Sequence, residues 1–437
     1  MRITVIGCGY LGAVHAACMA KLGHEVVGID VDEGKINSLS GAVAPFYEPN
    51  LNELLEDLRE TGRLSFTTDM TAAAGSDVHF ICVGTPQKEG ENGADLDYVY
   101  AATLSLRPHL RAGDVVVGKS TVPVGTAARL AGRIRNSEPG AHLVWNPEFL
   151  REGHAVADTL QPDRLVYGVQ DGSEDHPAVT ILDRVYSELL GAGIPRMVMA
   201  LPTAELVKAA ANSFLATKIS FINAMAEVCE ASGADVTQLA DAIGMDDRIG
   251  RKFLDAGIGF GGGCLPKDIR AFMARAGELG ADQALTFLRE VDAINVRRRE
   301  RVVELTRALC VGALQDKRIT VLGAAFKPES DDVRDSPALS IAAELHSQGA
   351  IVTVTDPKAL PNAAKRFPEL QYEFDTEWAI QGADALLLLT EWPQYRGLDP
   401  YELAGMVGSP RILDGRNVLD AAKWRAAGWT YRGLGRP

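Results

Sequence analysis

Short apolar runs alternate with helical stretches along the first part of the chain. A β-branched run at 3–6 ends in glycines, an alanine-rich stretch follows over 13–22, and a second apolar run occupies 25–29. Strand, helix and strand within about 30 residues form a βαβ unit, whose parallel strands need a right-handed crossover. Further strand-like runs follow at 78–83, 115–119 and 143–145. The pattern predicts a doubly wound α/β domain over residues 1–200.

The middle of the chain has a helical pattern, and the last part repeats the opening. Apolar residues recur at helical spacing over 203–232 and 282–310, which predicts two long helices. Arg318-Ile-Thr-Val-Leu-Gly323 then repeats Arg2-Ile-Thr-Val-Ile-Gly7. We therefore expect two Rossmann-like α/β domains joined by an all-helical domain, with ligands at the carboxyl ends of the strands. The expected domain ranges are 1–200, 201–313 and 314–437.

Composition narrows the kinds of partner. The 437 residues are 46% hydrophobic and 23% charged, which is typical of a chain with large buried cores. The net charge of −14 argues against broad binding to nucleic acid or acidic membranes and favours small-molecule partners. The six cysteines have no paired spacing, so we expect free thiols and no metal site. No signal peptide or membrane span is recognisable, which predicts a soluble, cytoplasmic protein.

The first turn carries a dinucleotide-binding pattern. It fits G-x-G-x-x-G and contains Gly7, Gly9, Tyr10, Leu11 and Gly12. Asp30 ends the next strand, eighteen residues after Gly12, where a carboxylate can accept the ribose hydroxyls of NAD and repel the 2′-phosphate of NADP. Lys35 could also reach the ribose, although a solvated helix lysine explains it equally well. The alternative for the whole motif is a plain tight turn.

Two later strands each end in a hydroxyl close to a proline. Thr85 precedes Pro86, and Thr121 lies two residues before Pro123. Side chains at such strand ends either line the cofactor crevice or form turns.

Two glutamates four residues apart belong to the acidic motif, Asn146–Gly153. Glu148 and Glu152 could share one helical face and divide proton transfer between them. A solvent-facing acidic pair is the alternative.

The first long helix carries three polar residues on one face. Glu205, Lys208 and Asn212 stand at i, i+3 and i+7 among apolar neighbours. A lysine with little solvent around it could stabilise a developing oxyanion, with Asn212 as a second donor. A solvated Glu205–Lys208 pair is the alternative.

The most informative segment is the glycine loop, Gly257–Gly263, which contains five glycines and leads into Cys264. Glycines let backbone amides approach a ligand, and Pro266 marks the first turn of a helix. A helix N-terminus lowers the pKa of a thiol, so Cys264 is a candidate nucleophile. Lys267 adds positive charge, and Asp268 could hold or deprotonate a water. A buried structural thiol is the alternative.

The last domain has a modified phosphate-binding loop. Ala325 and Phe326 follow Gly323, so the fingerprint is broken, yet Lys327 and Arg334 still suit a diphosphate. Arg416 is a further basic residue at a later strand end, where a simple turn is equally well supported.

Together these motifs resemble the UDP-glucose/GDP-mannose dehydrogenase family, in the family's order and over nearly the whole chain. The segments that carry the resemblance are Gly7–Gly12, Gly84-Thr85-Pro86, the acidic motif, Gly261–Asp268 and Phe326-Lys327-Pro328. The resemblance implies an NAD-dependent four-electron oxidation of a sugar C6 alcohol to a carboxylate, and a homodimer formed through the central helix. The segment Arg248–Leu254 resembles most the members that convert UDP-glucose to UDP-glucuronate.

The resemblance also implies roles for single residues. Cys264 would form a thiohemiacetal and then a thioester as two NAD molecules are used in turn. Lys208 and Asn212 would stabilise oxyanions, Asp268 would act through water, and the two glutamates of the acidic motif would handle protons in hydrolysis. The expected catalytic residues are Cys264, Lys208, Asn212, Asp268, Glu148, Glu152 and Thr121.

The implied binding residues form two sets. Beside the glycine-rich turn, NAD would contact Asp30, Lys35, Thr85, Thr121, Glu152, Lys267 and Arg334. The UDP-sugar would contact Glu148, Phe149, Leu150, Arg151, Glu152, Lys208, Asn212, Arg248, Phe253, Gly261, Lys327 and Arg416. Two alternatives stay open: the same chemistry on GDP-mannose or an N-acetylated UDP-sugar, and a non-catalytic protein that binds NAD or a nucleotide sugar.

Overall fold

The computed structural model describes residues 1–436, and the chain divides into two compact units. The first unit comprises Met1–Ala211 with Arg270–Gly280, and the second comprises Asn212–Ile269 with Ala281–Pro437. Two helices, α9 (Leu201–Ser232) and α11 (Leu265–Glu278), have residues in both units. The three domain ranges drawn from the sequence stay a prediction.

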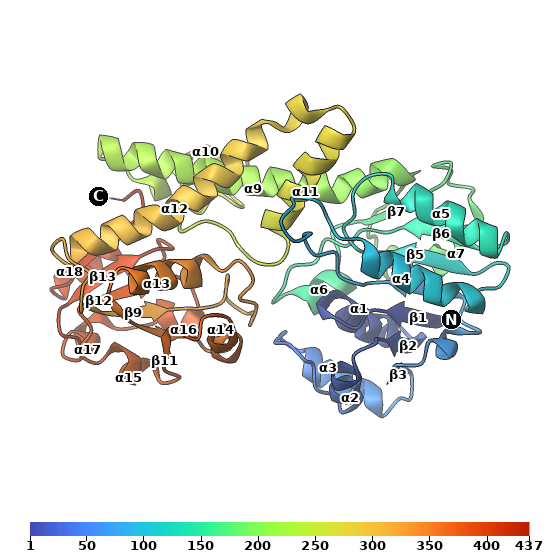
Figure 1. The fold of residues 1–437 in the computed structure, drawn as a ribbon, viewed down its shortest axis with the longest axis horizontal. Helices are drawn as coiled ribbons and strands as arrows, with labels where there is room; N and C mark the ends of the chain where they lie inside the picture. Colours follow the sequence, from blue (N-terminus) through green and yellow to red (C-terminus); the bar gives the residue numbers. More distant parts are fainter. Residues whose placement is uncertain (437) are drawn as a thin grey trace. The chain divides into compact units, whose positions relative to one another are not determined.

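The first unit is built on one sheet, shown on the blue-to-green side of Figure 1. Its strands are β1 (Arg2–Ile6), β2 (Glu25–Ile29), β3 (Leu64–Thr67), β4 (Val78–Ile81), β5 (Val115–Gly118), β6 (His142–Trp145), β7 (Leu165–Val169) and β8 (Arg196–Ala200). They lie in the order β3-β2-β1-β4-β5-β6-β7-β8. All neighbours are parallel except β6 and β7. The first six strands follow the Rossmann order, which confirms the predicted fold class.

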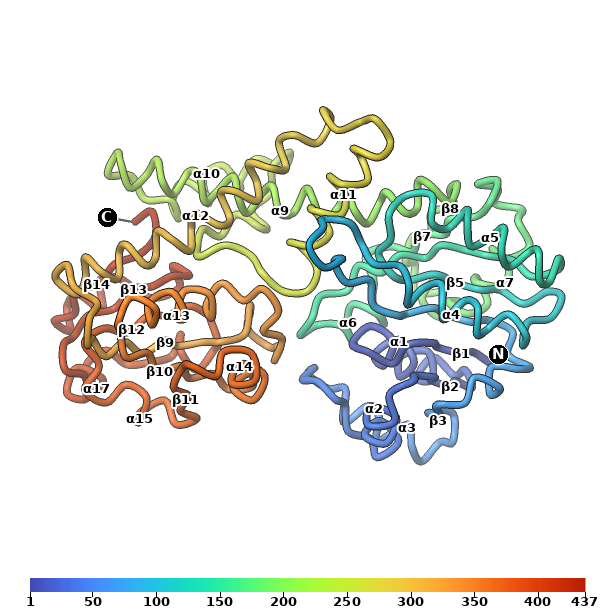
Figure 2. The backbone as a smooth tube through the Cα atoms, viewed as in Figure 1, coloured from blue at the N-terminus to red at the C-terminus, as the bar shows by residue number. Residues whose placement is uncertain are grey.

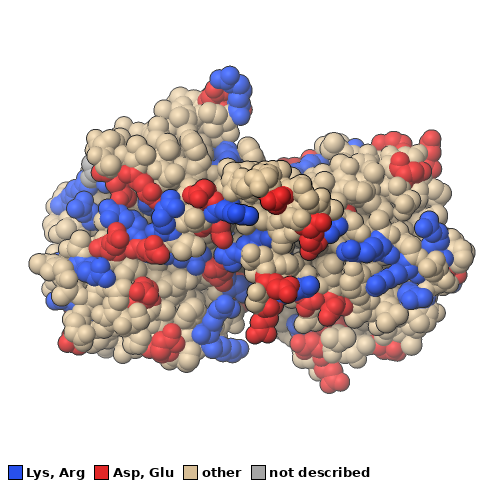
Figure 3. Space-filling view, turned by 45° about the horizontal axis from the view of Figure 1, so that its top comes forward, with Lys and Arg blue, Asp and Glu red and all other residues tan. Residues whose placement is uncertain are grey.

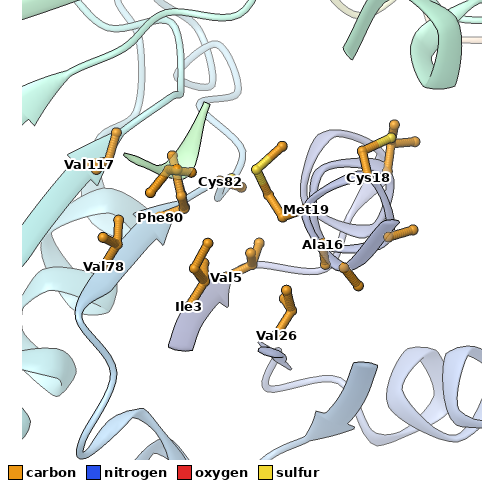
Figure 4. Packing of buried hydrophobic residues seen from close by; sticks show 14 of the residues in the cluster. Ile3, Val5, Ala16, Cys18, Met19, Val26, Val78, Phe80, Cys82 and Val117 are labelled. Carbon is orange, nitrogen blue, oxygen red and sulfur yellow. The ribbon is translucent and has the colours of Figure 1, made fainter. Parts of the chain in front are cut away.

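Helices cover both faces of this sheet because strand residues alternate between two cores. Ile3 and Val5 face one core, together with α1 and α3, whereas Ile6 faces the other, together with α4 and α5. Figure 4 shows Ile3 and Val5 beside Met19 and Ala16 of α1. The helices of this unit are α1 (Tyr10–Lys21), α2 (Glu33–Ser40), α3 (Leu51–Arg59), α4 (Asp97–Leu106), α5 (Thr126–Ser137), α6 (Ala155–Leu160), α7 (Pro177–Val185) and α8 (Ser187–Gly191), with 3₁₀ turns at Met70–Ala73 and Arg107–His109.

The central part of the chain is helical, as predicted. It contains α9, α10 (Val236–Gly244), α11 and α12 (Phe287–Leu309). The predicted start of α12 at Asp282 was five residues early, because Asp282–Leu285 forms a separate 3₁₀ turn. Apolar spacing alone does not distinguish such a turn from the first turn of an α-helix.

The second unit holds the repeated α/β fold. Its strands are β9 (Arg318–Leu322), β10 (Ile351–Thr355), β11 (Gln371–Tyr372), β12 (Ala385–Leu388), β13 (Arg411–Asp414) and β14 (Thr430–Gly433). The order β11-β10-β9-β12-β13-β14 is the Rossmann order again, and all neighbours are parallel. The helices are α13 (Pro337–Ser347), α14 (Leu360–Arg366), α15 (Thr376–Ile380), α16 (Pro393–Arg396), α17 (Pro400–Leu403) and α18 (Ala421–Ala426). The repeated opening sequence therefore forms the same central strand twice.

The face shown in Figure 3 is mixed in charge. Acidic and basic side chains are interspersed on the face shown in Figure 3, and neither sign forms one broad area there. Among residues 1–436, no helix is both long enough and apolar enough to cross a bilayer.

Candidate active site

The first glycine-rich turn is tightly built on one side and open on the other. Gly7 directly follows β1 and has a φ of +90°, and a Cβ added at Gly12 would lie 1.7 Å from the Gly7 carbonyl oxygen. A Cβ added at Gly9 meets no atom within 4 Å. Backbone can therefore approach a pyrophosphate at Gly9, just before α1 begins at Tyr10. Leu11 packs against the core below.

Asp30 lies at the end of β2 and faces this turn. Its Oδ2 accepts a 2.8 Å hydrogen bond from the Cys8 N–H, and its Oδ1 accepts one of 3.0 Å from the Asp32 N–H. The Nζ of Lys35 lies 3.9 Å from Oδ1, and 39% of the lysine side chain is exposed. The carboxylate is held on two sides, as a group that binds ribose hydroxyls needs to be. These residues fit the NAD contacts predicted for them.

The two threonine turns lie next to each other at the ends of β4 and β5. The Thr85 hydroxyl donates a 2.8 Å hydrogen bond to the Thr121 carbonyl, and the Ser120 hydroxyl donates one of 2.6 Å to the Val83 carbonyl. The structure thus brings together two residues that the sequence placed 36 positions apart.

Lys119, at the end of β5, is a buried residue that the sequence reasoning did not single out. Its Nζ donates a 3.0 Å hydrogen bond to Asn146 of the acidic motif, and Asn146 also accepts one of 2.8 Å from the Tyr186 hydroxyl. Burial lowers the pKa of Lys119 to about 8. A lysine inside an otherwise apolar strand was the available signal.

The acidic motif is an irregular loop, so the expectation that one helical face presents both glutamates was wrong. The helix that follows, α6, begins only at Ala155. Glu148 instead forms a 3.0 Å ion pair with Lys208 of α9, and both side chains are largely buried. Glu152 is half-buried farther along the same loop. The partner of Glu148 is a lysine that is distant in the sequence, so the spacing of the two glutamates could not predict it.

The alternative Glu205–Lys208 pair is also wrong. The Glu205 carboxylate accepts hydrogen bonds of 2.7 and 2.6 Å from the N–H groups of Gly125 and Ala127, at the start of α5. An acid at a helix N-terminus satisfies backbone donors that would otherwise lack partners. Lys208 therefore pairs with Glu148 and not with Glu205.

Glu48 is a second buried residue that sequence reasoning missed. Its carboxylate accepts 2.6 Å hydrogen bonds from the N–H groups of Gly153 and Ala155, which fixes the acidic motif to the start of α6. The Tyr10 hydroxyl donates to the same carboxylate. Burial and this acid raise the pKa of Tyr10, so the phenol stays protonated. Glu48 thus connects the glycine-rich turn to the acidic motif.

Cys264 directly precedes α11, as predicted, and is exposed, whereas the other five cysteines are buried. The Asp268 N–H closes the first helical turn with a 2.9 Å bond to the Cys264 carbonyl. The Asp268 carboxylate accepts a 2.7 Å hydrogen bond from the Asn212 amide and lies 2.5 Å from the Lys267 Nζ. Four predicted residues are therefore neighbours within the second unit.

The glycine loop has close neighbours that exclude side chains. Figure 2 shows it within the irregular stretch between α10 and α11. A Cβ at Gly261 would lie 2.2 Å from the Asp335 carbonyl, and one at Gly263 would lie 2.3 Å from the Arg334 guanidinium. The Gly262 N–H donates 2.9 Å to the Arg334 carbonyl. Arg334 therefore borders the loop, where it also pairs with Asp332 at 2.7 Å.

Arg416 holds the loops of the second unit together rather than forming a simple turn. Its guanidinium donates to the carbonyls of Gly259 and Phe326, each at 3.2 Å, and pairs with Glu391 at 3.1 Å. Lys327 lies 5.6 Å from the centre of the Phe326 ring. Both residues adjoin the modified phosphate-binding loop.

The remaining predicted substrate residues lie in both units. In the acidic motif, the Leu150 N–H donates to Glu148, Arg151 pairs with Asp158 at 2.7 Å, and Phe149 stacks under the Arg164 guanidinium. In the second unit, Arg248 is 89% exposed and pairs with Asp246, and Phe253 adopts a φ of +65°. Their contacts with a substrate stay a prediction.

The second α/β fold has its own acid at the position of Asp30. Asp356 follows β10, is 2% exposed, and accepts from the N–H groups of Ala324 and Ala325 and from the Trp392 indole. Its second oxygen accepts from Lys358 and Ala359. Five protein donors fill the roughly four acceptor positions of this carboxylate and leave little capacity for ribose hydroxyls, whereas Asp30 accepts hydrogen bonds from two backbone N–H groups.

Comparisons with known proteins identify relatives over the whole chain. The chain matches the UDP-glucose/GDP-mannose dehydrogenase family in its NAD binding domain (residues 1–190), its central domain (202–297) and its UDP binding domain (320–421). The UDP-glucose 6-dehydrogenase of Rhizobium meliloti strain 1021 is 43% identical over 440 residues, with 100% of both chains covered.

Two solved structures are similar over the whole chain. A UDP-glucose dehydrogenase from the hyperthermophilic archaeon Pyrobaculum islandicum has a TM-score of 0.90 and 38% identity, with 100% of this chain and 98% of that chain covered. A UDP-D-ManNAc dehydrogenase from Pyrococcus horikoshii has a TM-score of 0.87 and 26% identity, with 100% and 99% covered. The resemblance seen in the motifs is therefore confirmed, and the chain belongs to the UDP-glucose/GDP-mannose dehydrogenase family.

Proposed function

We propose that this protein oxidises UDP-glucose to UDP-glucuronate, with two NAD molecules as hydride acceptors. The observation that carries the proposal is the placement of Cys264, the exposed cysteine of the described residues, at the start of α11 beside the Asn212–Asp268–Lys267 cluster. The family's NAD-binding and UDP-binding domains match on either side of that cysteine. The R. meliloti relative, which covers the whole chain, supports UDP-glucose as the sugar nucleotide.

The first unit suits NAD. The turn at Gly7–Gly12 leaves room for the pyrophosphate, Asp30 can bind the ribose, and Thr85 and Thr121 lie at neighbouring strand ends. Bound NAD would supply an acceptor for the hydride that leaves C6 of the sugar. The negative charge of Asp30 disfavours the 2′-phosphate of NADP.

The chain's own residues divide the proton and acyl chemistry. In the first oxidation, a water held by Asp268 accepts the C6 hydroxyl proton as hydride leaves C6, and Lys208 and Asn212 stabilise the developing oxyanion. The Cys264 thiolate then bonds to the aldehyde carbon, and a second hydride leaves the resulting thiohemiacetal to give a thioester. Water attacks the thioester with proton transfer assisted by Glu148 and Glu152, the C–S bond breaks, and carboxylate and thiol are formed.

These steps need residues from both units. The support for assigning them to one reaction is helix α9, which carries Lys208 in the first unit and Asn212, four residues later, in the second. Lys208 pairs with Glu148, and Asn212 binds Asp268. Lys208 and Asn212 thus each hold one carboxylate that the proposed reaction uses.

The second unit also suits a homodimer through the central helix. Phe214, Phe221 and Val228 of α9 are spaced by seven residues and are 67%, 48% and 57% exposed. Large apolar side chains on one helical stripe favour contact with a second copy. The substitution Phe221→Asp is expected to yield monomers in light scattering, and an unchanged dimer mass would contradict this interface. We infer a cytoplasmic location from the use of NAD and from the six cysteines, none of which forms a disulfide among the described residues.

The test is stoichiometry. Purified protein with UDP-glucose should form two NADH per sugar and release UDP-glucuronate, whereas one NADH with free aldehyde would contradict the mechanism. The variant Cys264→Ser should form no acid while binding NAD and UDP-glucose, and the buried Cys229→Ala serves as the matched control. Undiminished turnover of Cys264→Ser would refute the nucleophile.

A nucleotide-sugar panel separates the alternatives. GDP-mannose and N-acetylated UDP-sugars, compared with UDP-glucose by kcat/KM, should be poorer substrates. A preference for one of them would keep the mechanism and change the substrate. Binding of both ligands without any NADH would instead indicate a non-catalytic binding protein.

A further inference from the structure

The glycine loop is held at its centre by one buried amide side chain. The Oδ1 of Asn295, in α12, accepts a 2.7 Å hydrogen bond from the Phe260 N–H, and its Nδ2 donates one of 2.9 Å to the Phe260 carbonyl. Asn295 is only 1% exposed. A Cβ added at Gly259 would lie 2.3 Å from the same Oδ1. The amide therefore clamps both polar groups of Phe260 and requires glycine at the preceding position.

A second contact of the same kind fixes the start of the loop. The Gly257 N–H donates 2.8 Å to the Asn223 Oδ1 of α9, and the Gly257 carbonyl accepts from the buried Arg298 of α12. Residues 295, 298 and 299 lie on one face of α12 because they are at i, i+3 and i+4. Arg299 donates a longer hydrogen bond of 3.4 Å to the Phe260 carbonyl and pairs with Asp335 at 2.9 Å. One face of α12 thus holds the loop at Gly257 and Phe260.

The loop needs such external support because of its composition. Glycines lose more conformational entropy on ordering than any other residue and have no side chains that could fix their own position. Five of them lie between 257 and 263, and Cys264 follows at once. The position of the sulfur therefore depends on the contacts that hold the loop, which include those of Asn295 with Phe260 and the hydrogen bond between Gly262 and Arg334.

We propose that Asn295 is a positioning residue for Cys264, which sets the place of the thiol through its two hydrogen bonds to Phe260. The inference rests on the proposed function, because it assigns Asn295 to the capture of the aldehyde by the thiol. Loss of the clamp leaves the thiol displaced, so the aldehyde leaves before the second oxidation.

The test variant is Asn295→Leu, which keeps the side-chain size and removes both hydrogen bonds. We expect kcat for acid formation to fall on the order of 100-fold, since small misplacements of reacting groups have effects of this size. KM for UDP-glucose should change less than about threefold. The ratio of NADH to UDP-glucuronate should rise above two, with free aldehyde trapped by semicarbazide. A protein that is merely less stable would lose rate but keep a ratio of two.

Two variants serve as comparisons. Val302→Ala removes buried volume two turns farther along the same helix and should keep the ratio at two. Asn295→Asp keeps the acceptor for the Phe260 N–H but loses the donor to the Phe260 carbonyl, so its kcat should lie between those of the parent and Asn295→Leu. If Asn295→Leu does not fold, Asn295→Asp and Asn295→Ser are measured in the same way. A ratio of two and kcat within twofold of the parent in folded Asn295→Leu, or in folded Asn295→Ser where the leucine variant does not fold, would overturn the proposal.

A readout without substrate separates this proposal from the proposed function. In the folded protein, iodoacetamide should alkylate Cys264 selectively, because the other five cysteines are buried. The rate of this reaction is the readout. It should change at least threefold in Asn295→Leu and stay constant in Val302→Ala. If the parent protein forms no NADH with UDP-glucose, the proposed function is refuted. The alkylation rates still decide whether Asn295 positions the thiol. Equal rates in the parent and Asn295→Leu would overturn that proposal.

Discussion

The Asn212 amide donates a 2.7 Å hydrogen bond to the Asp268 carboxylate, one helical turn beyond Cys264. Both side chains are buried, at 7% and 3% exposure. The bond connects α9 to α11 and, together with Lys267, determines which way the carboxylate points. A carboxylate fixed in this way suits the handling of a proton at one defined position.

Replacing Asp268 by asparagine should leave the packing intact and remove the acceptor charge. We expect kcat to fall by about 100-fold or more, the usual contribution of a positioned general base. Steady-state NADH formation measures it, with binding of NAD checked separately. The exposed Asp282→Asn in the same unit is the control, and a loss below fivefold for Asp268→Asn would argue against its role.

Asp30→Ser should lower the affinity for NAD and reduce the preference for NAD over NADP. The variant loses the acceptor for the ribose and the negative charge that repels a 2′-phosphate, so we expect about a tenfold higher Kd for NAD. Calorimetry with both dinucleotides measures the change, and Asp32→Asn, which keeps the cap of α2, is the control. Equal NAD affinity in parent and variant would place the ribose elsewhere.

Lys119→Met should change how stability depends on pH. The pKa of Lys119 is about 8 in the folded protein and about 10.5 when solvated, so below about pH 8 burial of its charge opposes folding by about 3 kcal/mol. Between these values the folded state releases the proton first, and the free energy of unfolding of the parent rises with pH relative to the variant. Urea unfolding at pH 7.5 and 10 measures the difference. Parallel pH profiles would show that Lys119 is not titrating in this range.

Glu48→Gln should loosen the acidic motif. The carboxylate receives two backbone N–H groups and the Tyr10 hydroxyl, and hydrogen bonds to a charged acceptor contribute about 1.5–3 kcal/mol. We expect a loss of that size in the free energy of unfolding, measured in urea, together with a lower kcat. Glu53→Gln, at an exposed position of α3, should have no effect on either quantity.

Local patterns in the sequence were enough to predict the two Rossmann folds, the helical middle and the helix start after Cys264. The turn at Gly7–Gly12 and the glycine loop are informative because glycine patterns report backbone geometry directly. Two neighbours of Asp268 could be predicted because they are close to it in sequence: Lys267 lies on the same helix, and Cys264 directly precedes that helix.

Contacts between distant segments could not be predicted from spacing. Glu148 pairs with Lys208, 60 positions away, and Glu205 caps α5 instead of pairing with that lysine. Glu48 and Asn295 each hold backbone groups of a remote loop, and a single acid or amide carries no periodic signal. Burial decides these partners, and it depends on the whole fold.

The engagement of Asp356 by Trp392 limits how the second sheet could be redesigned. Grafting the missing glycines after Gly323 would restore the fingerprint in letters only, since the acid would remain committed to five protein donors. To bind a second dinucleotide there, the protein would first have to lose some of the hydrogen bonds that Asp356 accepts. The two Rossmann folds of this chain therefore cannot exchange roles.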